Sequence, residues 1–409
     1  MRYEKIKKML EEKGQEQLLR YYDELTGSEQ ENLLTAIEEM DWTFEVALQD
    51  EGKGKSAMGK IEPIEGLRVA KIKEKQAYYK EIGKKAIQDG KVAAILLAGG
   101  MGTRLGWDGP KGSYDIGVTK PLYIFEQQVK NLLQVVEECG AYVPMYIMTS
   151  DKNHDATIAF WKEHNYFGYP EKEIKFFKQD MAPATDFDGK ILLERKDMPA
   201  LSPNGNGGWF TSLKRAGYSQ ELRERGVEWL NIYAVDNVLQ RIADPVFIGA
   251  TIDAKKNCGA KVVCKAYPEE KVGVLCLEDG NPTIIEYYEL GEEMANMRDA
   301  DGSLSYIYGV ILNYLFNLDK LDEIASKKIP VHIVKKKVQT LDKNGVPYKP
   351  STENGKKFET LVVDLIQYMG SVLPFEVERE KEFAPIKNPT GIDSVESARE
   401  LLRKNGVEV

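Results

Sequence analysis

The sequence predicts an α/β protein with a mixed, mostly parallel central sheet. Between Val92 and about residue 278, short apolar strands alternate with helical segments, and this alternation is typical of a parallel sheet with helices on both faces. The first strand, at 92–98, runs directly into a glycine-rich loop. With 409 residues, 42% of them hydrophobic and 30% charged, the chain is long enough for about two to three domains.

The N-terminal part of the chain is predicted to be helical. Residues 1–50 carry apolar residues at helical spacing, and Ser28 with Glu31 matches the S-x-x-E capping box that begins a second helix. Residues 51–66 are rich in glycine and lysine, which predicts a loop, and a further helix is expected over 70–88.

The alternating region supplies the predicted sheet. Strands are predicted at 92–98, 142–150, 173–179, 229–237, 260–266 and 272–278, and helices at 121–139 and 154–164. After about residue 330 the chain is expected to form a short α/β region. We therefore divide the chain into an N-terminal helical region at 1–88, a catalytic domain at 89–330 and a C-terminal region at 331–409.

Composition excludes several classes of protein. The longest apolar runs are far shorter than the ~20 residues of a membrane-spanning helix, and the initial residues MRYEKIKKMLEEKG lack the apolar core of a secretory signal. Four cysteines without a C-x-x-C pair and three scattered histidines argue against a zinc site and fit reduced thiols in the cytosol. The net charge of −9 argues against a nucleic-acid-binding surface. We expect a cytoplasmic protein with neither membrane nor nucleic acid as a partner.

The stretch ILLAGGMGTRLGWDGPKG, at 95–112, predicts a phosphate-binding loop. A P-loop is excluded because Lys111 follows Pro110 rather than glycine. The glycine spacing disfavours a dinucleotide fingerprint, and the following WDGP cannot begin a helix. The remaining interpretation is a nucleotidyltransferase loop, L-x-x-G-x-G-T-R-L-G followed by P-K. Its glycines let the backbone approach phosphates, and Arg104 and Lys111 supply positive charge.

Further motifs follow this loop in a fixed order. They are LAGGMGTRLG at 97–106, PKG at 110–112, MTSDKNH at 148–154, FFKQD at 176–180, SPNGNGGWF at 202–210, VDN at 235–237, ADPVFIG at 243–249, CGAKVV at 258–263, IEYYE at 285–289 and FAPIKN at 383–388. The series resembles the eukaryotic-type UDP-N-acetylhexosamine pyrophosphorylase family, within the UDP-sugar pyrophosphorylases. The resemblance covers about residues 70–390 and implies a Rossmann-like nucleotidyltransferase fold.

The resemblance also implies a site, residue by residue. The residues expected to bind UTP are Leu97, Ala98, Gly99, Gly100, Lys111, Gln179, Gly205, Asp236 and Lys357. Those expected to bind the sugar 1-phosphate are Asn206, Glu286, Tyr287 and Lys387. Arg104, Lys111 and Lys387 are expected to be catalytic, since they bring positive charge to the phosphates. Asp236 is expected to hold Mg²⁺ there, while Gln179 and Gly205 meet the uracil edge.

Four of these assignments have plainer alternatives. Gln179 could be an exposed residue at the end of a strand, and Gly205 could belong to an ordinary turn. Asp236 could cap the segment that follows its strand, although a carboxylate at the end of a buried strand is where open α/β sheets place ligand groups. Lys356 could serve in place of its neighbour Lys357.

The chain departs from the family at positions that bear on the sugar and on assembly. Val310 stands where the family commonly has an asparagine that contacts a sugar hydroxyl, and Leu361 aligns with a phenylalanine near the acetamido pocket. The C-terminal region is expected to be truncated relative to eukaryotic members. We therefore do not assume their dimer contacts, and we expect a monomer or a weak homo-oligomer.

The activity implied by the resemblance is uridylyl transfer from UTP to a hexose 1-phosphate, giving a UDP-sugar and pyrophosphate. N-acetylglucosamine 1-phosphate or a related hexose 1-phosphate is the expected substrate, with glucose 1-phosphate as the alternative. The attacking phosphate oxygen is already anionic, so positioning and charge neutralisation are expected to do most of the catalytic work. A non-catalytic UDP-sugar-binding protein is the rival interpretation, disfavoured because Arg104 and Lys111 are both retained beside Asp236.

Overall fold

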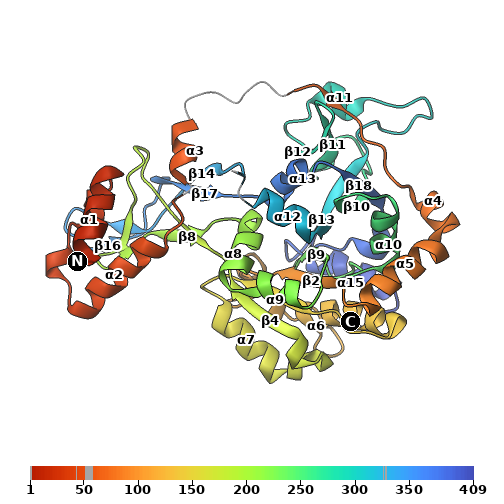
Figure 1. Ribbon diagram of the computed structural model, residues 1–409, viewed down its shortest axis with the longest axis horizontal. Coiled ribbons are helices and arrows are strands. Elements are labelled where there is room, and N and C mark those ends of the chain that lie inside the picture. Colours follow the sequence, from red (N-terminus) through yellow and green to blue (C-terminus); the bar gives the residue numbers. More distant parts are fainter. Residues whose placement is uncertain (1, 43, 51–58, 326, 328) are drawn as a thin grey trace. The chain divides into compact units, whose positions relative to one another are not determined.

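The computed structural model describes residues 2–42, 44–50, 59–325, 327 and 329–409 (Figure 1). The chain forms two compact units, each made of three stretches of sequence. The first unit comprises Met1–Ala57, Gln179–Gly208 and Lys328–Val362. The second comprises Met58–Lys178, Trp209–Lys327 and Val363–Val409. Of the loop expected at 51–66, residues 51–58 lie outside the described residues.

The first unit combines helices with small antiparallel sheets. Its helices are α1 (Arg2–Glu12), α2 (Gly27–Glu39) and α3 (Phe44–Asp50). Its strands are β5 (Met181–Pro183), β6 (Leu193–Arg195), β7 (Met198–Pro199), β8 (Leu201–Pro203), β14 (His332–Lys336), β15 (Thr340–Leu341), β16 (Pro347–Tyr348) and β17 (Gly355–Glu359). They pair as β5–β8, β6–β7, β14–β17 and β15–β16. Ile6 of α1 and Leu34 of α2 share one buried cluster with Ile191 and Phe358, so the helices and sheets of this unit have a common core.

The capping box of α2 lies two residues before the predicted one. The Thr26 side chain accepts a hydrogen bond from the backbone N–H of Glu29, and the Glu29 carboxylate accepts one from the N–H of Thr26 at 2.8 Å. The sequence TGSEQE contains two overlapping S/T-x-x-E pairs, and the helix begins at the first of them. The prediction that Ser28 and Glu31 form the box is therefore wrong.

The second unit is built on a ten-stranded mixed sheet. Its strands are β1 (Ile61–Glu62), β2 (Val92–Leu97), β3 (Met145–Thr149), β4 (Ile174–Lys178), β9 (Trp229–Ala234), β10 (Cys258–Cys264), β11 (Val274–Glu278), β12 (Asn281–Ile285), β13 (Tyr308–Asn317) and β18 (Val372–Glu376). The main path through the sheet is β1-β11-β13-β9-β2-β3-β4, with β12 beside β11, β10 beside β13 and β18 beside β10.

Four strands of this sheet form a parallel half in the order β4-β3-β2-β9. The chain passes from β2 through α6 (Ile124–Cys139) to β3, and through α7 (His154–Glu163) to β4. It then returns through α8 (Trp209–Arg215) and α9 (Tyr218–Glu224) to β9, on the other side of β2. This reversal creates a switch point between the carboxyl ends of β2 and β9, which is where open α/β sheets bind ligands.

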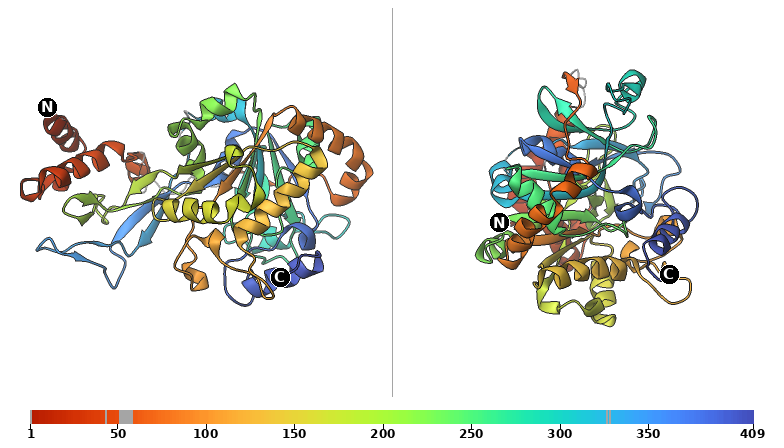
Figure 2. Two further views of the ribbon diagram at one scale, coloured as in Figure 1. Left: turned by 90° about the horizontal axis from the view of Figure 1, so that it is seen from below. Right: turned by 90° about the vertical axis from the view of Figure 1, so that its right-hand side faces the viewer.

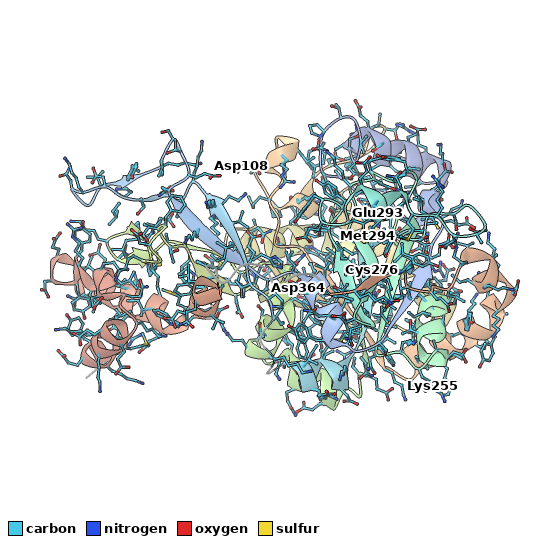
Figure 3. All side chains as sticks on the ribbon, turned by 90° about the horizontal axis from the view of Figure 1, so that it is seen from above. Asp108, Lys255, Cys276, Glu293, Met294 and Asp364 are labelled. Carbon is cyan, nitrogen blue, oxygen red and sulfur yellow. The ribbon has the colours of Figure 1, made fainter. Side chains whose placement is uncertain are left out.

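The other half of the sheet is largely antiparallel. Strand β13 runs antiparallel to β9, β10 and β11, and β12 runs antiparallel to β11, whereas β18 is parallel to β10. The sheet is therefore mixed, as expected, with three of its parallel pairings in the β4-β3-β2-β9 half and a fourth between β10 and β18. Cys276 of β11 lies in a small buried cluster of this half, and Met294 of α11 (Glu292–Asn296) packs against that cluster (Figure 3).

Side chains alternate between the two faces of the parallel half. Met145 and Ile147 of β3 belong to the large buried cluster that also contains Val129 of α6. Tyr146, between them, packs on the opposite face against Tyr218 of α9, with ring centroids 5.4 Å apart. Figure 2 shows helices on both sides of the sheet, so both faces of these strands are covered.

The remaining helices of the second unit come from both ends of the sequence. They are α4 (Val69–Glu74), α5 (Gln76–Gln88), α10 (Pro245–Asp253), α12 (Leu318–Ile324), α13 (Leu365–Tyr368), α14 (Arg379–Glu382) and α15 (Val395–Lys404). The single helix expected over 70–88 is thus divided at Lys75. Helices α5 and α10 approach so closely at Gly83 that a Cβ there would lie 1.9 Å from the carbonyl oxygen of Pro245.

The two units do not follow the three regions expected in sequence order. Helices α4 and α5 belong to the second unit although they lie within 1–88, and the region 331–409 is divided near Val362. Pairing between segments far apart in sequence explains the difference. For example, Thr185 and Lys356 form an antiparallel bridge in the first unit, and β18 pairs with β10 in the second.

Candidate active site

The glycine-rich loop begins where β2 ends and holds its own shape through hydrogen bonds. The N–H of Gly102 donates to the carbonyl of Gly109 at 2.9 Å, and the N–H of Lys111 donates to the carbonyl of Gly100 at 3.1 Å. Trp107 packs within the loop, where its indole N–H donates to the hydroxyl of Ser113 at 3.0 Å. These contacts give the loop a defined conformation at the switch point of the sheet.

The loop presents backbone rather than side chains where its glycines lie. Leu97 and Ala98 are 7% and 1% exposed, so their side chains are buried. Gly100 is exposed, and apart from Gly100 and its two chain neighbours no atom of the described residues lies within 4 Å of the place that its Cβ would occupy. Packing therefore does not require glycine there, and the open space suits a bound group. Gly99, between the buried Ala98 and the exposed Gly100, is half-buried.

Four predicted site residues interact electrostatically in the second unit. Burial lowers the pKa of Lys111, and the positive charges of Arg104 and Lys387 lower it further, whereas the carboxylate of Asp236 acts to raise it. The two loop cations, Asp236 and Lys387 are therefore near neighbours. Asp108, in the same loop, is exposed (Figure 3). Lys357, which was also expected to meet the phosphates, belongs to the first unit.

Backbone hydrogen bonds join the segments that carry Asp236 and Lys387. The carbonyl of Asp236 accepts a hydrogen bond from the N–H of Ile386 at 2.8 Å. The adjacent Asn237 side chain accepts one from the N–H of Ala384 at 2.9 Å. Lys387 itself forms an ion pair with Asp393 at 3.1 Å. The position of Lys387 thus depends on the turn that follows β9.

A buried network of ion pairs holds Glu382, which lies a few residues before Lys387. Lys261 of β10 is fully buried, and its ammonium lies 3.0 Å from the carboxylate of Asp244 and 2.5 Å from that of Glu382. The main-chain carbonyl of Glu382 accepts a hydrogen bond from the Asn237 amide at 2.7 Å. Since removing one partner of a buried pair costs about 3–5 kcal/mol, these charges hold the end of α14 firmly in place.

A second group of predicted residues lies together in the first unit. The Gln179 amide nitrogen donates to the carbonyl of Gly205 at 2.6 Å. Gly205 has φ +88°, and a Cβ there would lie 2.1 Å from the carbonyl oxygen of Thr360, so only glycine fits. The side-chain oxygen of Asn206 accepts a hydrogen bond from the N–H of Val362 at 3.0 Å. Gln179 is 8% exposed, which excludes the alternative of an exposed strand-end residue.

The structure separates the two neighbouring lysines of β17. Lys356 is buried, and its ammonium donates to the carbonyl of Phe187 at 2.9 Å. Lys357 is half-buried, and successive side chains of a strand point to opposite faces. Lys356 therefore makes a buried hydrogen bond inside the first unit. Lys357 is the better candidate for a ligand contact.

Glu286, one of the predicted sugar contacts of the second unit, lies near the start of β13. Val310 donates its N–H to the carbonyl of Gly273 at 2.9 Å. A Cβ at Gly273 would lie 3.5 Å from the Val310 side chain and 3.7 Å from the Glu286 carboxylate, so these two side chains flank one spot. Tyr287 is 39% exposed and stacks edge-to-face on Tyr288. A bulge follows Val310, where Leu312 has φ 53°.

Sequence reasoning missed three residues that support the site. Asn153 donates hydrogen bonds from its buried amide to two carbonyls of the glycine-rich loop. Ser113 anchors Trp107, and Asp393 pairs with Lys387. Asn153 lies in the motif MTSDKNH, which was recognised only as a marker of the family. None of the three belongs to a spacing pattern that indicates its role, because each acts on a segment distant in sequence or through a loop.

The fold and the charged loop define a nucleotidyltransferase, and comparisons with known proteins agree. The family model described as UTP–glucose-1-phosphate uridylyltransferase matches residues 39–406. The chain therefore belongs to this family.

Named relatives and solved structures extend the match over nearly the whole chain. UDP-N-acetylhexosamine pyrophosphorylase-like protein 1 of Homo sapiens is 37% identical over 97% of this chain and 83% of its own length. UDP-N-acetylglucosamine pyrophosphorylase of Saccharomyces cerevisiae is 34% identical over 98% and 89%. The uridine diphosphate N-acetylglucosamine pyrophosphorylase structure from Trypanosoma brucei is 27% identical, with a TM-score of 0.84, over 98% and 84%.

No helix among the described residues is both long and apolar enough to cross a membrane.

The lowered pKa of Lys111 predicts a pH dependence. Because the ammonium loses its proton at a lower pH than an exposed lysine, kcat/KM should fall as pH rises through this lowered pKa. The kcat/KM profile reports the free enzyme. In Arg104→Gln, one repelling charge is removed, so the alkaline limb should move to higher pH. The limb for kcat should also lie at higher pH, since bound phosphates stabilise the ammonium. An alkaline limb that stays in place in Arg104→Gln would contradict this assignment.

Proposed function

We propose that this protein transfers a uridylyl group from UTP to a hexose 1-phosphate, releasing a UDP-sugar and pyrophosphate. The observation that supports this most directly is the group of three cations, Arg104, Lys111 and Lys387, beside Asp236 at the switch point of the sheet. Three cations, set against the carboxylates of Asp236 and Asp393, suit two phosphate-bearing substrates. The printed names of the relatives, which describe UDP-N-acetylhexosamine and UDP-N-acetylglucosamine pyrophosphorylases, agree with this chemistry.

The proposed reaction is a direct displacement at the α-phosphorus. A phosphate oxygen of the sugar 1-phosphate forms the new P–O bond, the bond between the α- and β-phosphates breaks, and the electron pair leaves with pyrophosphate. The attacking oxygen carries its charge already, so no side chain has to remove a proton. The task of the protein is to align two anions and neutralise their charge. Lys111 and Arg104 stabilise the leaving pyrophosphate, and Lys387 holds the attacking phosphate.

Burial makes Lys111 suited to this role. Its ammonium is partly withdrawn from water, which is the main cause of its lowered pKa. A charge in such a place interacts more strongly with a phosphate than a fully solvated one does. Losing one preorganised donor to a developing anion typically costs about 2.7–4 kcal/mol, so we assign Lys111 the larger share of transition-state stabilisation.

The residues present fit a magnesium ion held jointly with substrate. Among the described residues, no group of three or more His, Cys, Asp or Glu side chains forms a site that could hold a metal alone. Magnesium usually takes one or two carboxylates together with substrate phosphates, and Asp236 provides one carboxylate at the end of β9 beside the loop cations. We propose Asp236 as the protein ligand. When bound, the ion would neutralise phosphate charge.

Uracil recognition is proposed for the first unit. The Gln179 amide nitrogen is engaged by Gly205, which fixes the orientation of the side chain. An amide presents a donor and an acceptor, and this pairing directs its carbonyl oxygen toward a donor such as the uracil N–H. Gly205 contributes main-chain atoms in a turn that only glycine can form. Lys357, on β17 of the same unit, is proposed as a further contact for UTP.

In the second unit, Glu286 and Tyr287 are proposed to contact the sugar, with N-acetylglucosamine 1-phosphate as the main candidate. Val310 favours glucose 1-phosphate as a second candidate. Valine cannot hydrogen-bond a hydroxyl through its side chain, and it lies beside Glu286 near Gly273. We also propose a cytoplasmic location, consistent with four free cysteines, and a monomeric or weakly associating protein.

A substrate panel tests the proposed function. We expect pyrophosphate release from UTP and Mg²⁺ with hexose 1-phosphates, tested as the glucose, galactose, N-acetylglucosamine and N-acetylgalactosamine derivatives. CTP and ATP should be poor substitutes for UTP, because their base edges do not match Gln179. As a control, Lys120→Ala removes an exposed lysine that pairs with Glu408 and should leave the rate unchanged. If no sugar 1-phosphate releases pyrophosphate, or if CTP serves as well as UTP, the proposal fails.

Val310 predicts a broad sugar preference. Sites that hydrogen-bond a hydroxyl reject analogues strongly, and valine removes one such contact. We expect glucose 1-phosphate to compete with N-acetylglucosamine 1-phosphate in the unmodified protein. Val310→Asn should sharpen the preference by about 1–3 kcal/mol where the new side chain finds a partner, measured as the ratio of kcat/KM values. Strict use of N-acetylglucosamine 1-phosphate, with glucose 1-phosphate inert, would contradict this expectation.

A further inference from the structure

Asn153 links two strand ends beneath the glycine-rich loop. It is fully buried, and it lies between the end of β3 and the start of α7. Its amide nitrogen donates to the carbonyl of Ala98 at 2.9 Å and to the carbonyl of Gly100 at 3.2 Å. One side chain therefore binds two carbonyls of the loop that follows β2.

The orientation of this amide is determined by a third residue. The Asn153 side-chain oxygen accepts hydrogen bonds from the N–H of Ser150 at 2.8 Å and from its hydroxyl at 3.1 Å. A backbone N–H can only donate, so the oxygen must face Ser150 and the NH₂ group must face the loop. Both sides of the amide are thus engaged, and a flipped arrangement would leave buried polar groups unpaired.

The two accepted carbonyls determine the direction of two N–H groups. In a trans peptide the C=O and N–H bonds point in opposite directions, and the part of the chain that the structure describes has no cis peptide bonds. Because the carbonyls of Ala98 and Gly100 point toward Asn153, the N–H groups of Gly99 and Met101 point away from it. Nearby N–H groups directed to one side form a concave site for an anion. The open space beside Gly100 leaves room for such a ligand.

We propose that Asn153 is a positioning residue for the UTP site: it turns the peptides after Ala98 and Gly100 so that their N–H groups face the nucleotide. It does not contact substrate itself. The inference rests on the proposed function, because it concerns how the same loop receives UTP. It predicts that Asn153 affects nucleotide binding beyond its contribution to the stability of the fold.

A matched asparagine separates these two effects. Asn231 of β9 is also buried, donates its amide hydrogens to Asn313 at 2.8 Å and Tyr314 at 2.9 Å, and accepts from the N–H of Ala243 at 2.7 Å. Asn153→Ala and Asn231→Ala remove comparable sets of buried hydrogen bonds. Only the first removes hydrogen bonds to the glycine-rich loop: the carbonyl of Ala98 loses its Asn153 partner, and the carbonyl of Gly100 keeps only the N–H of Lys111.

Calorimetric titration with UTP and Mg²⁺ tests the inference, together with thermal unfolding of each variant. We expect both alanine variants to unfold at lower temperature. Asn153→Ala should raise the Kd for UTP by about 10- to 100-fold, whereas Asn231→Ala should leave it near the unmodified value. If Asn153→Ala does not fold, the serine variants at the two positions replace it, and Asn153→Ser should weaken UTP binding more than Asn231→Ser.

The outcomes distinguish this inference from the proposed function. An unmodified protein that does not bind UTP would contradict the proposed function itself. An unmodified protein that binds UTP, with equal Kd values for the Asn153 and Asn231 variants, would overturn only the role of Asn153 and make it a purely structural residue.

Discussion

Repulsion between two phosphate groups is the constraint on which the proposed mechanism depends. A sugar phosphate and a triphosphate must be held in contact, so the protein has to concentrate positive charge without losing stability. Lys111 shows the conflict directly, because burial and two neighbouring cations all lower its pKa, and Asp236 alone among the named causes opposes them. Bound phosphates would bring negative charge to these cations and favour the charged form of Lys111.

The sheet supplies the geometry for this concentration of charge. The chain adds β3 and β4 on one side of β2 and then β9 on the other side, parallel to β2. The carboxyl ends of β2 and β9 therefore lie side by side. The loop cations follow one strand and Asp236 follows the other, and the segment carrying Lys387 is joined to Asp236 by the hydrogen bond from Ile386. Behind it, the buried ammonium of Lys261 secures Glu382. The site therefore depends on contacts between segments distant in sequence.

Local patterns were enough to predict the parallel strands and the glycine-rich loop that follows β2, since each is encoded within a short stretch. The catalytic role of Arg104, Lys111 and Lys387 came from the family resemblance and stays a prediction. It was harder to predict which of two adjacent or nearby residues has a given role. Overlapping capping pairs at Thr26 and Ser28 match one template equally well, and Lys356 and Lys357 differ only in the face of β17 that they occupy. The division into two units and the contacts of Asn153 depend on pairing between residues far apart in sequence. A single sequence carries no direct signal for such pairing.

The stereochemical course at the α-phosphorus tests the central claim most directly. With a single chiral α-thio isomer of UTP and a hexose 1-phosphate, one in-line displacement between two aligned anions inverts the configuration at phosphorus. The account predicts inversion, because the protein aligns the substrates and neutralises charge without forming a bond to the uridylyl group. Retention of configuration would reveal two successive displacements through a uridylyl-enzyme intermediate and would contradict the account.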